Sequence, residues 1–347
     1  MLDQEKQILV VGAGIVGASI AYHLAQRGMN VRVLDSNQPA GGATGSAFGW
    51  ITSAVRDDAP DAFLRRASVS DWQRLAAEIP ELWINWKGAM SYADAPQPAL
   101  ADHIQIDQTT ITRMEPALNA PPEQALYVEK DGIIDPGIAT HILLNRAEQM
   151  GAQLSYPATV RAIIRDNDKV IGVETSAGRF EADCIVLACG TGIPQLAETI
   201  GVSIPIIASP AILLRVSTPL PVVNAIIAGD DMEVRHAQNG DLLAAEDYPE
   251  NGDVDAIADT AIATIKKRLK GAEHCTLIGR SVGLRPVPAN GYPVVGFIDD
   301  NQQIYVAVMH PAVTCAATLG RLIGDELVTG DSDLPEIYRP ASLSFEL

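Results

Sequence analysis

The sequence ILVVGAGIVGASIAYHLAQRGMNVRVLD, from Ile8 to Asp35, decides the fold. Its first four residues are apolar and predict a buried strand, and the apolar spacing from Ile15 to Ala25 predicts a helix. Gly28 fits the end of this helix, because glycine commonly follows the last helical turn. The apolar positions of Val31–Leu34 predict a second strand. The stretch therefore predicts a strand-turn-helix-strand unit.

Three glycines form the pattern GxGxxG at the junction between the first strand and the helix: Gly12, Gly14 and Gly17. In this pattern the first glycine permits a tight turn, the second lets a pyrophosphate approach the backbone, and the third lets the helix pack closely on the strand. Ile15 and Val16 lie in the first helical turn. The free N–H groups of such a helix N-terminus can bind phosphates.

Asp35 follows the second strand directly and lies 18 residues beyond Gly17. At this place a carboxylate can accept hydrogen bonds from an adenosine ribose. An ordinary buried strand-turn-helix needs neither all three glycines nor the terminal acid. The stretch thus predicts an adenine dinucleotide site, and by itself it leaves both NAD and FAD open.

The composition excludes several classes of partner and of site. The 347 residues include 25 Lys+Arg and 43 Asp+Glu, and the formal net charge of −18 argues against nucleic acid and anionic membranes as partners. The start of the chain has no apolar signal segment, and no run approaches the roughly 18 apolar residues of a transmembrane span. We therefore expect a cytoplasmic protein. The four cysteines lack metal-ligand spacing, so we expect neither a metal site nor a disulfide framework.

Helices and strands are expected to alternate along the rest of the chain. Expected helices cover residues 61–78, 136–150, 255–269 and 314–327, and expected strands cover 159–163, 170–174, 185–190, 212–216, 232–236, 242–245 and 304–308. Residues 278–296 contain several glycines and prolines and predict a passage rich in turns.

This interleaving predicts an α/β protein with two domains, which the length and the hydrophobic content of 47% allow. A three-layer nucleotide domain of the Rossmann type is expected to combine residues 1–80, 136–204 and 278–347. A substrate domain of the α+β type, built on a mainly antiparallel sheet, is expected from residues 81–135 and 205–277.

Five stretches, in this order along nearly the whole chain, resemble the D-amino-acid oxidase family of flavoproteins, and most of all its glycine oxidase and sarcosine oxidase branch. They are Gly12–Gly17 with Asp35, Gly41–Trp50, Asp131–Pro136, Ala188–Gly190, and Gly283–Pro286 followed by His310–Thr314. The third and the fifth stretches are the most particular to this family. The resemblance implies an FAD-binding domain of the Rossmann type and FAD, rather than NAD, as the cofactor.

The resemblance also implies which residues contact FAD. The pyrophosphate and adenosine contacts would be Gly12, Gly14, Ile15, Val16, Gly17, Asp35, Ser36, Val160 and Gly190, and the phosphate and flavin contacts would be Thr44, Ser46, Ala47, Gly49, Trp50, Val313 and Thr314. Sarcosine oxidases carry a flavin-linking cysteine near the position of Gly283–Arg285, where this chain has none. We therefore expect the FAD to be noncovalent.

Arg285 is the residue that the resemblance assigns to the substrate, because the Arg of this Gly-Leu-Arg-Pro motif binds the substrate carboxylate in similar proteins. A guanidinium offers two parallel donors that match a carboxylate, although a structural ion pair with a surface acid would also explain an Arg here. Tyr248 and His310 are further candidates, the first as a substrate-side hydroxyl and the second at the flavin edge or in proton transfer. The sequence does not decide whether Arg235 and His236 are structural or line the substrate site.

The implied reaction is oxidation of a small amino acid or N-methyl amino acid. The α-carbon would pass a hydride to flavin N5, the resulting imine would hydrolyse to an oxo acid, and oxygen or another acceptor would reoxidise the flavin. Two alternatives stay open: a 2-hydroxy-acid dehydrogenase on the same fold, and a flavin-binding protein without turnover. Pro311–Ala312 supports the last alternative, because the family commonly has Ser-Gly there, Pro lacks an N–H donor, and Ala tolerates a positive φ poorly.

Overall fold

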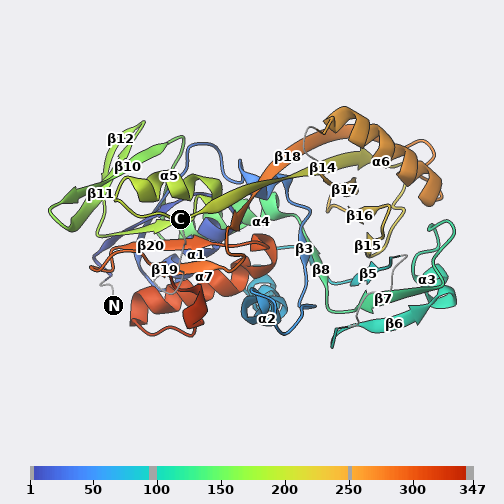
Figure 1. Ribbon diagram of the computed structural model, residues 1–347, viewed down its shortest axis with the longest axis horizontal. Coiled ribbons are helices and arrows are strands. Elements are labelled where there is room, and N and C mark those ends of the chain that lie inside the picture. The colour runs from blue at the N-terminus through green and yellow to red at the C-terminus, as the bar shows by residue number, and fades with distance from the viewer. Residues whose placement is uncertain (1–3, 94–99, 249–251, 341–347) are drawn as a thin grey trace. The chain divides into compact units, whose positions relative to one another are not determined.

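The computed structural model describes residues 4–93, 100–248 and 252–340, and the chain divides into two compact units. The first unit comprises residues 1–45, 136–209 and 284–347, and the second comprises residues 46–135 and 210–283. Both units combine helices with β-sheets (Figure 1). The predicted α/β fold class is confirmed, because the first unit contains a parallel sheet and the second a mainly antiparallel one.

The first unit is organised around a six-stranded sheet with the order β19-β20-β13-β1-β2-β9, in which only β19 is antiparallel to its neighbour. The strands of the unit are β1 (Gln7–Val11), β2 (Asn30–Leu34), β9 (Gln153–Ser155), β10 (Val160–Asp166), β11 (Lys169–Thr175), β12 (Gly178–Glu181), β13 (Cys184–Leu187), β19 (Val294–Phe297) and β20 (Ile304–Val308). Its helices are α1 (Ile15–Gln26), η1 (Ala43–Ser46), α4 (Pro136–Gln149), η2 (Gly190–Gly192), α5 (Ile193–Glu198), α7 (Ala312–Thr329) and η3 (Glu336–Tyr338).

Alternation along β1 divides the core of this unit between two faces of the sheet. Leu9 and Val11 share a buried cluster with residues of α5 and of the small sheet β10-β11-β12, such as Leu196 and Val173. The side chain of Val10 instead lies on the α1 side, 3.4 Å from where a Cβ on Gly17 would be. The strand is buried on both faces, which is typical of parallel sheets and explains its unbroken apolar sequence.

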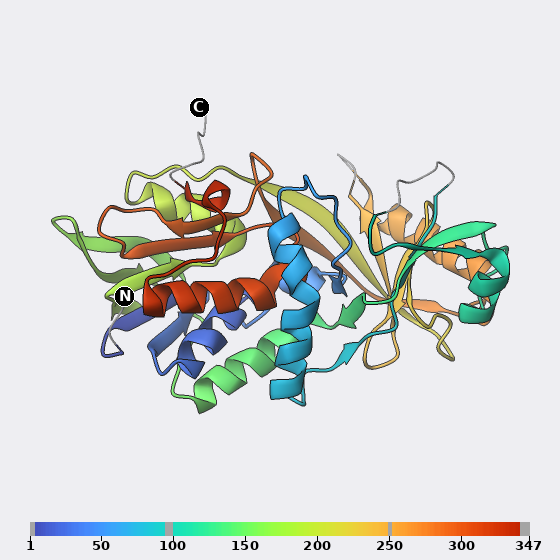
Figure 2. The same ribbon diagram turned by 90° about the horizontal axis from the view of Figure 1, so that it is seen from below.

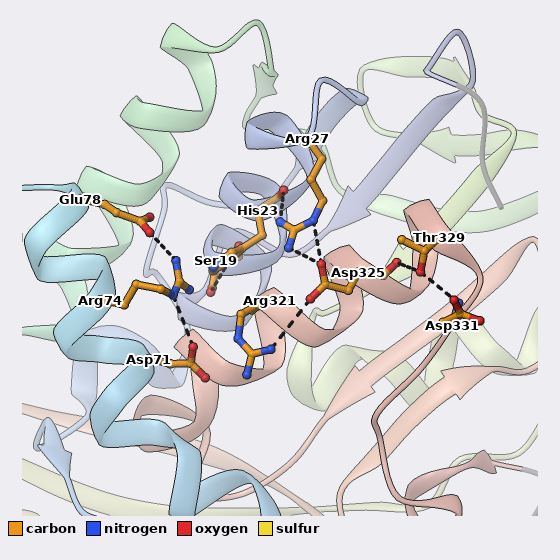
Figure 3. Close-up of polar contacts among 10 residues, drawn as sticks. All are labelled: Ser19, His23, Arg27, Asp71, Arg74, Glu78, Arg321, Asp325, Thr329 and Asp331. Carbon is orange, nitrogen blue, oxygen red and sulfur yellow. Dashed lines mark hydrogen bonds and ion pairs between the residues drawn. The ribbon is translucent and has the colours of Figure 1, made fainter.

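Helices α1 and α7 lie side by side in the first unit (Figure 2). A Cβ on Gly320 would lie 2.2 Å from Ser19 Oγ, so this crossing requires a glycine in α7. Further along the two helices, Arg27 binds Asp325 with an Nη2–Oδ1 distance of 2.5 Å (Figure 3). The close approach positions the N-terminus of α1, where the GxGxxG motif lies.

The second unit contains an eight-stranded sheet with the order β18-β14-β17-β16-β15-β5-β7-β6 and a small sheet with the order β3-β8-β4. Its strands are β3 (Trp50–Ile51), β4 (Ile84–Asn85), β5 (Ala89–Ser91), β6 (Ile104–Asp107), β7 (Gln124–Val128), β8 (Gly132–Ile134), β15 (Ile226–Ala228), β16 (Glu233–His236) and β17 (Leu242–Asp247), with most of β14 (Ile206–Ser217) and β18 (Thr276–Pro288). Its helices are α2 (Ala62–Glu78), α3 (Gln108–Met114) and α6 (Val254–Arg268). The core is apolar and includes Leu214, Val234 and Leu242 from the sheet and Ile265 from α6.

The passage predicted to be rich in turns is the one clear error in the expected elements. Residues 276–288 form the long strand β18, and turns follow only after Pro288. Alternate residues from Thr276 to Leu284 are exposed, because successive side chains of a strand point to opposite faces of the sheet and one face is exposed here. β18 is also the outermost strand of its sheet. Pro286 and Pro288 are tolerated because an edge strand leaves some of its N–H groups without a ladder partner. The prolines therefore mark a sheet edge and not a turn.

Candidate functional site

The GxGxxG turn is held by contacts that exclude larger residues. Gly12 has a φ of +112°, and a Cβ there would lie 2.5 Å from the carbonyl oxygen of Ala188. A Cβ on Gly17 would lie 1.9 Å from the carbonyl oxygen of Gly12. These two glycines therefore fix how β1, α1 and the end of β13 pack, as the motif predicts.

Gly14 occupies the N-cap of α1 with extended backbone angles. A Cβ on Gly14 would lie 3.1 Å from Thr44 Oγ1, and apart from Gly14 and its two chain neighbours no other described residue comes within 4 Å of that point. The Thr44 hydroxyl accepts a hydrogen bond of 3.1 Å from the Ile15 N–H. The turn is thus an open cradle at the positive end of a helix, and it fits the pyrophosphate of a dinucleotide.

Asp35 lies against this cradle from the end of β2. Its Oδ2 accepts a hydrogen bond of 2.6 Å from the Ala13 N–H, and its Oδ1 accepts one of 2.8 Å from the Asn37 N–H. The Asp35 carbonyl accepts a hydrogen bond of 2.6 Å from the Ala158 N–H, which brings the start of β10 at Val160 to the same place. The adenosine residues predicted from the sequence therefore gather within the first unit, where exposed Ser36 follows Asp35.

Gly190 follows β13 and has a φ of +57°, so a side chain there would be strained. A Cβ on Gly190 would lie 3.5 Å from the ring of Pro286. The Ala188–Gly190 junction thus lies between the GxGxxG turn and the Gly-Leu-Arg-Pro motif.

The His310–Thr314 turn connects β20 to the first turn of α7. His310 is exposed, Val313 is half-buried and Thr314 is buried. Pro311 is the N-cap with a φ of −91°, and Ala312 is the first helical residue. The N–H of an N-cap residue has no intrahelical partner, so proline removes nothing that the helix needs, and Ala312 is not forced into a positive φ. The departure from Ser-Gly therefore leaves the helix N-terminus intact.

Arg285 is half-buried on β18, and Ser209 of β14 holds its guanidinium. Arg285 Nη2 donates to Ser209 Oγ at 2.9 Å, and Nε donates to the Ser209 carbonyl oxygen at 3.4 Å. These bonds fix the direction of the guanidinium plane. Its predicted role as the carboxylate-binding residue stays a prediction.

The remaining predicted contacts belong to the second unit, and Trp50 is the best defined of them. Trp50 pairs with Ile133 of β8 in the small sheet, and its indole Nε1 donates to Asp131 Oδ2 at 2.7 Å. Gly49 has a φ of +83° and accepts a hydrogen bond of 3.0 Å from the Ile134 N–H. Ser46, Ala47, Gly49 and Trp50 thus form one continuous segment whose end is tied to β8.

The sequence suggests no role for Asp131, although this residue begins the Asp131–Pro136 stretch that resembles the family. Its side chain is fully buried, and burial raises the pKa of this carboxyl from 3.8 to about 7. The hydrogen bond from Trp50, the Thr52 hydroxyl, the Ser53 N–H and the charge of Arg65 lower the pKa of Asp131 by less than burial raises it. Near neutral pH this carboxyl is therefore divided between its protonated and its ionised form.

Arg235 and His236, whose roles the sequence left open, are structural in this unit. Arg235 is fully buried, donates to the carbonyls of Phe48 and Ile134, and pairs with Asp135 at 3.1 Å. Burial lowers the pKa of Arg235 to about 10, so the guanidinium stays charged at neutral pH. His236 Nε2 accepts from the Val222 N–H at 2.9 Å, which requires the neutral ring.

Tyr248 lies just beyond the end of β17 in the second unit. Its ring is half-buried and packs against the apolar core of that unit. Part of the side chain is therefore committed to packing, and its substrate-side role stays a prediction. In the second unit the predicted residues do not form one group, because Tyr248 and Trp50 pack against different apolar clusters.

Among residues 4–93, 100–248 and 252–340, no group of His, Cys, Asp or Glu could hold a metal ion. Within the same described residues, no helix combines the length and the apolarity needed to cross a bilayer.

Comparison with known families gives one match that covers most of the chain. The model of the DAO family, described as FAD dependent oxidoreductase, matches residues 7–326. This match confirms the predicted family, the FAD cofactor and the oxidoreductase class.

Individual relatives agree with the family match. The glycine oxidase of Bacillus licheniformis is 24% identical over 345 residues, with 92% of each chain covered. The 4-methylaminobutanoate oxidase (formaldehyde-forming) of Paenarthrobacter nicotinovorans is 32% identical over 231 residues, but these are 62% of this chain and only 28% of that longer enzyme. Among solved structures, the glycine oxidase of Geobacillus kaustophilus matches with a TM-score of 0.86 and 19% identity, over 99% of this chain and 100% of the other.

Proposed function

Because the chain belongs to the DAO family of FAD-dependent oxidoreductases, we propose that it oxidises a small amino acid or N-methyl amino acid at the α-carbon. The observation that carries this proposal is the half-buried guanidinium of Arg285, which Ser209 holds in a fixed direction. The names of the glycine oxidase and the 4-methylaminobutanoate oxidase support a substrate with an amine and a carboxylate.

The residues of the first unit would hold the adenosine half of the cofactor. The open N-terminus of α1 would bind the pyrophosphate over Gly14, and the Thr44 hydroxyl would line the same cradle. Asp35 can accept a ribose hydroxyl because each carboxylate oxygen keeps a lone pair beyond the backbone hydrogen bond that it accepts.

FAD, when bound, supplies the two-electron acceptor that takes the hydride from the substrate. The N-terminus of α7, beginning at Ala312, would present its positive dipole end to the negative charge of the reduced ring. Because this stabilisation comes from backbone N–H groups, it survives the replacement of Ser-Gly by Pro311–Ala312. His310, exposed directly before this helix, is the candidate for moving a proton at the ring edge.

Arg285 would orient the substrate by its carboxylate, so that the α-carbon faces the acceptor and the neutral amine supports hydride loss. The product imine would then react with water to give an oxo acid and to release ammonia, or methylamine from an N-methyl amino acid. The same arginine could also bind the carboxylate of a 2-hydroxy acid. The preference for an amino-acid substrate therefore comes from the names of the relatives, and a direct comparison of amino acids with hydroxy acids as substrates tests it.

The test compares Arg285→Ala with Arg285→Lys and with Arg280→Ala, a variant of the same strand. We expect Arg285→Ala to retain FAD and to raise KM by a factor of at least about 100, because it loses two charged hydrogen bonds of about 1.5 to 3 kcal/mol each. Arg285→Lys should keep the charge and recover part of the loss. Arg280 is exposed and pairs with Asp255, so Arg280→Ala should match the unmodified protein. An unchanged KM in Arg285→Ala, or loss of FAD, contradicts the carboxylate role.

A further inference from the structure

Two buried charged groups hold the 48–50 segment of the second unit from both sides. At one end, Arg235 donates to the Phe48 carbonyl, and its guanidinium carbon lies 5.5 Å from the centroid of the Phe48 ring. At the other end, Asp131 accepts the indole N–H of Trp50. Gly49 joins them in a left-handed conformation and accepts the Ile134 N–H. The segment therefore has little freedom while both charged groups keep their bonds.

The two buried groups that bind the ends of the 48–50 segment differ in how many of their polar atoms form hydrogen bonds. Arg235 forms hydrogen bonds to three carbonyls, those of Phe48, Ile134 and His236, and pairs with Asp135. Asp131 Oδ2 accepts the Trp50 indole N–H. The fully buried Oδ1 forms no hydrogen bond of normal geometry among the described residues, although the Thr52 hydroxyl and the Ser53 N–H lie close enough to the carboxyl to lower its pKa. A buried carboxylate with one unsatisfied oxygen is costly in its ionised form. Asp131 is thus the end of the segment at which a proton can change the bonding.

We propose that Asp131 is a positioning residue whose protonation state sets the orientation of the Trp50 indole. The inference rests in one respect on the FAD site of the proposed function, because Trp50 is one of the flavin contacts that the family resemblance implies. When Asp131 is ionised, the Trp50 N–H donates a charge-assisted bond, which is shorter and stronger than a bond to a neutral carboxyl. This stronger bond requires a negative charge on Asp131 in the protein interior, which costs free energy. Loss or gain of one proton at Asp131 therefore changes both the strength of the hydrogen bond to the Trp50 indole and the electrostatic field around the indole.

The groups that face Asp131 permit this change near neutral pH. Burial raises the pKa of the carboxyl to about 7, and the positive charge of Arg65 in α2 lowers it by less. Arg65 is paired with Asp61 at 2.5 Å, which limits its effect on Asp131. On the β7 side lies Tyr127, whose pKa is raised mainly by burial and further by the charges of neighbouring acids, Asp131 among them. Tyr127 is therefore neutral throughout the range in which Asp131 titrates.

The test is a pH titration of the holoenzyme labelled with 5-fluorotryptophan and followed by fluorine NMR. Trp50→Phe assigns the Trp50 resonance, and the resonance of Trp72, which is buried in α2, is the internal control. We expect the Trp50 resonance to shift with a midpoint near pH 7, while that of Trp72 stays constant. In Asp131→Asn, which keeps an accepting oxygen and cannot ionise, the Trp50 shift should disappear. A Trp50 resonance that does not titrate, or that titrates equally in Asp131→Asn, overturns the proposal.

The absorption spectrum of the bound flavin is the second readout, and it needs no substrate. We expect the spectrum to change with the same midpoint in the unmodified protein and to be constant with pH in Asp131→Asn and in Trp50→Phe. If Asp131→Asn does not fold, Trp50→Phe decides, because it removes the indole and with it the N–H that bonds to Asp131, while an aromatic side chain stays at position 50. A spectrum that titrates identically in Trp50→Phe overturns the link between Asp131, Trp50 and the flavin. Since neither readout involves turnover, a wrong substrate class would leave both results unchanged.

Discussion

The GxGxxG turn of the first unit and the 48–50 segment of the second unit are both held rigidly, by opposite means. The turn is shaped by backbone, because Gly12 and Gly17 admit contacts that a Cβ would block. The 48–50 segment is shaped by buried charge, since Arg235 and Asp131 bind its two ends. Backbone packing is insensitive to pH, whereas a buried carboxyl is not. If FAD binds as proposed, its adenosine end would be held in the same way at every pH, whereas the hydrogen bond at Trp50 would change as Asp131 titrates.

The largest effect should come from breaking the backbone contact of the turn. Gly17→Val would place a Cβ 1.9 Å from the Gly12 carbonyl oxygen, so the strand-turn-helix unit cannot keep its packing. We expect protein that is purified without FAD or that fails to fold. Gly137→Ala, in α4 of the same unit, is the matched control, because its Cβ would meet only an ordinary contact at 4.0 Å and should leave FAD content unchanged. Normal FAD content in Gly17→Val would show that this contact does not shape the turn.

The next effect should come from removing the buried cation of the second unit. Arg235→Met leaves Asp135 without its ion-pair partner, and breaking a buried pair in this way costs about 3 to 5 kcal/mol of unfolding free energy. Chemical denaturation measures the loss. The exposed pair of Arg56 and Asp58 supplies the control, since Arg56→Ala should leave the denaturation curve unchanged. Equal denaturation midpoints for Arg235→Met and Arg56→Ala would show that the buried Arg235–Asp135 pair does not stabilise this unit.

A smaller, pH-dependent effect is expected for Asp131→Asn. The pKa of Asp131 is raised by folding, so the protonated form contributes stability that is complete below pH 3.8 and is lost as pH rises through about 7. Asn does not ionise, and the variant should therefore gain stability relative to the unmodified protein over this range, by at most about 4 kcal/mol. Unfolding free energies at pH 5 and pH 8 measure the difference. A difference that is constant with pH would mean that Asp131 does not titrate in the folded protein.

The smallest effect should come from the half-exposed pair between α1 and α7. Arg27 Nη2 lies 2.5 Å from Asp325 Oδ1, but the Asp325 side chain is 43% exposed, so solvent screens the interaction. We expect Arg27→Met to lower the unfolding free energy by less than about 1 kcal/mol and to leave the FAD content normal. A loss as large as that of Arg235→Met would show that this pair, and not the Gly320 contact, holds the two helices together.

The same comparison explains what the sequence could and could not predict. The GxGxxG turn and Asp35 are local, because all their parts lie within one strand-helix-strand unit and follow known spacing. Asp131 and Arg235 are separated from the 48–50 segment by about 80 and 185 residues, and no periodicity connects them to it. The strand β18 was mistaken for turns because its prolines lie at a sheet edge, which only the assembled strand order reveals. Local motifs were therefore predictable, and long-range pairs of buried charges were not.

Anaerobic reduction of the bound FAD, followed by its visible absorption, tests the central claim most directly. The panel should contain glycine, N-methylglycine, other small amino acids and the matching 2-hydroxy acids, each added to the unmodified protein and to Arg285→Ala. The account predicts that at least one amino or N-methyl amino acid bleaches the flavin, that no hydroxy acid does so, and that Arg285→Ala needs far more substrate. Bleaching by hydroxy acids alone, or by no member of either class, would contradict it.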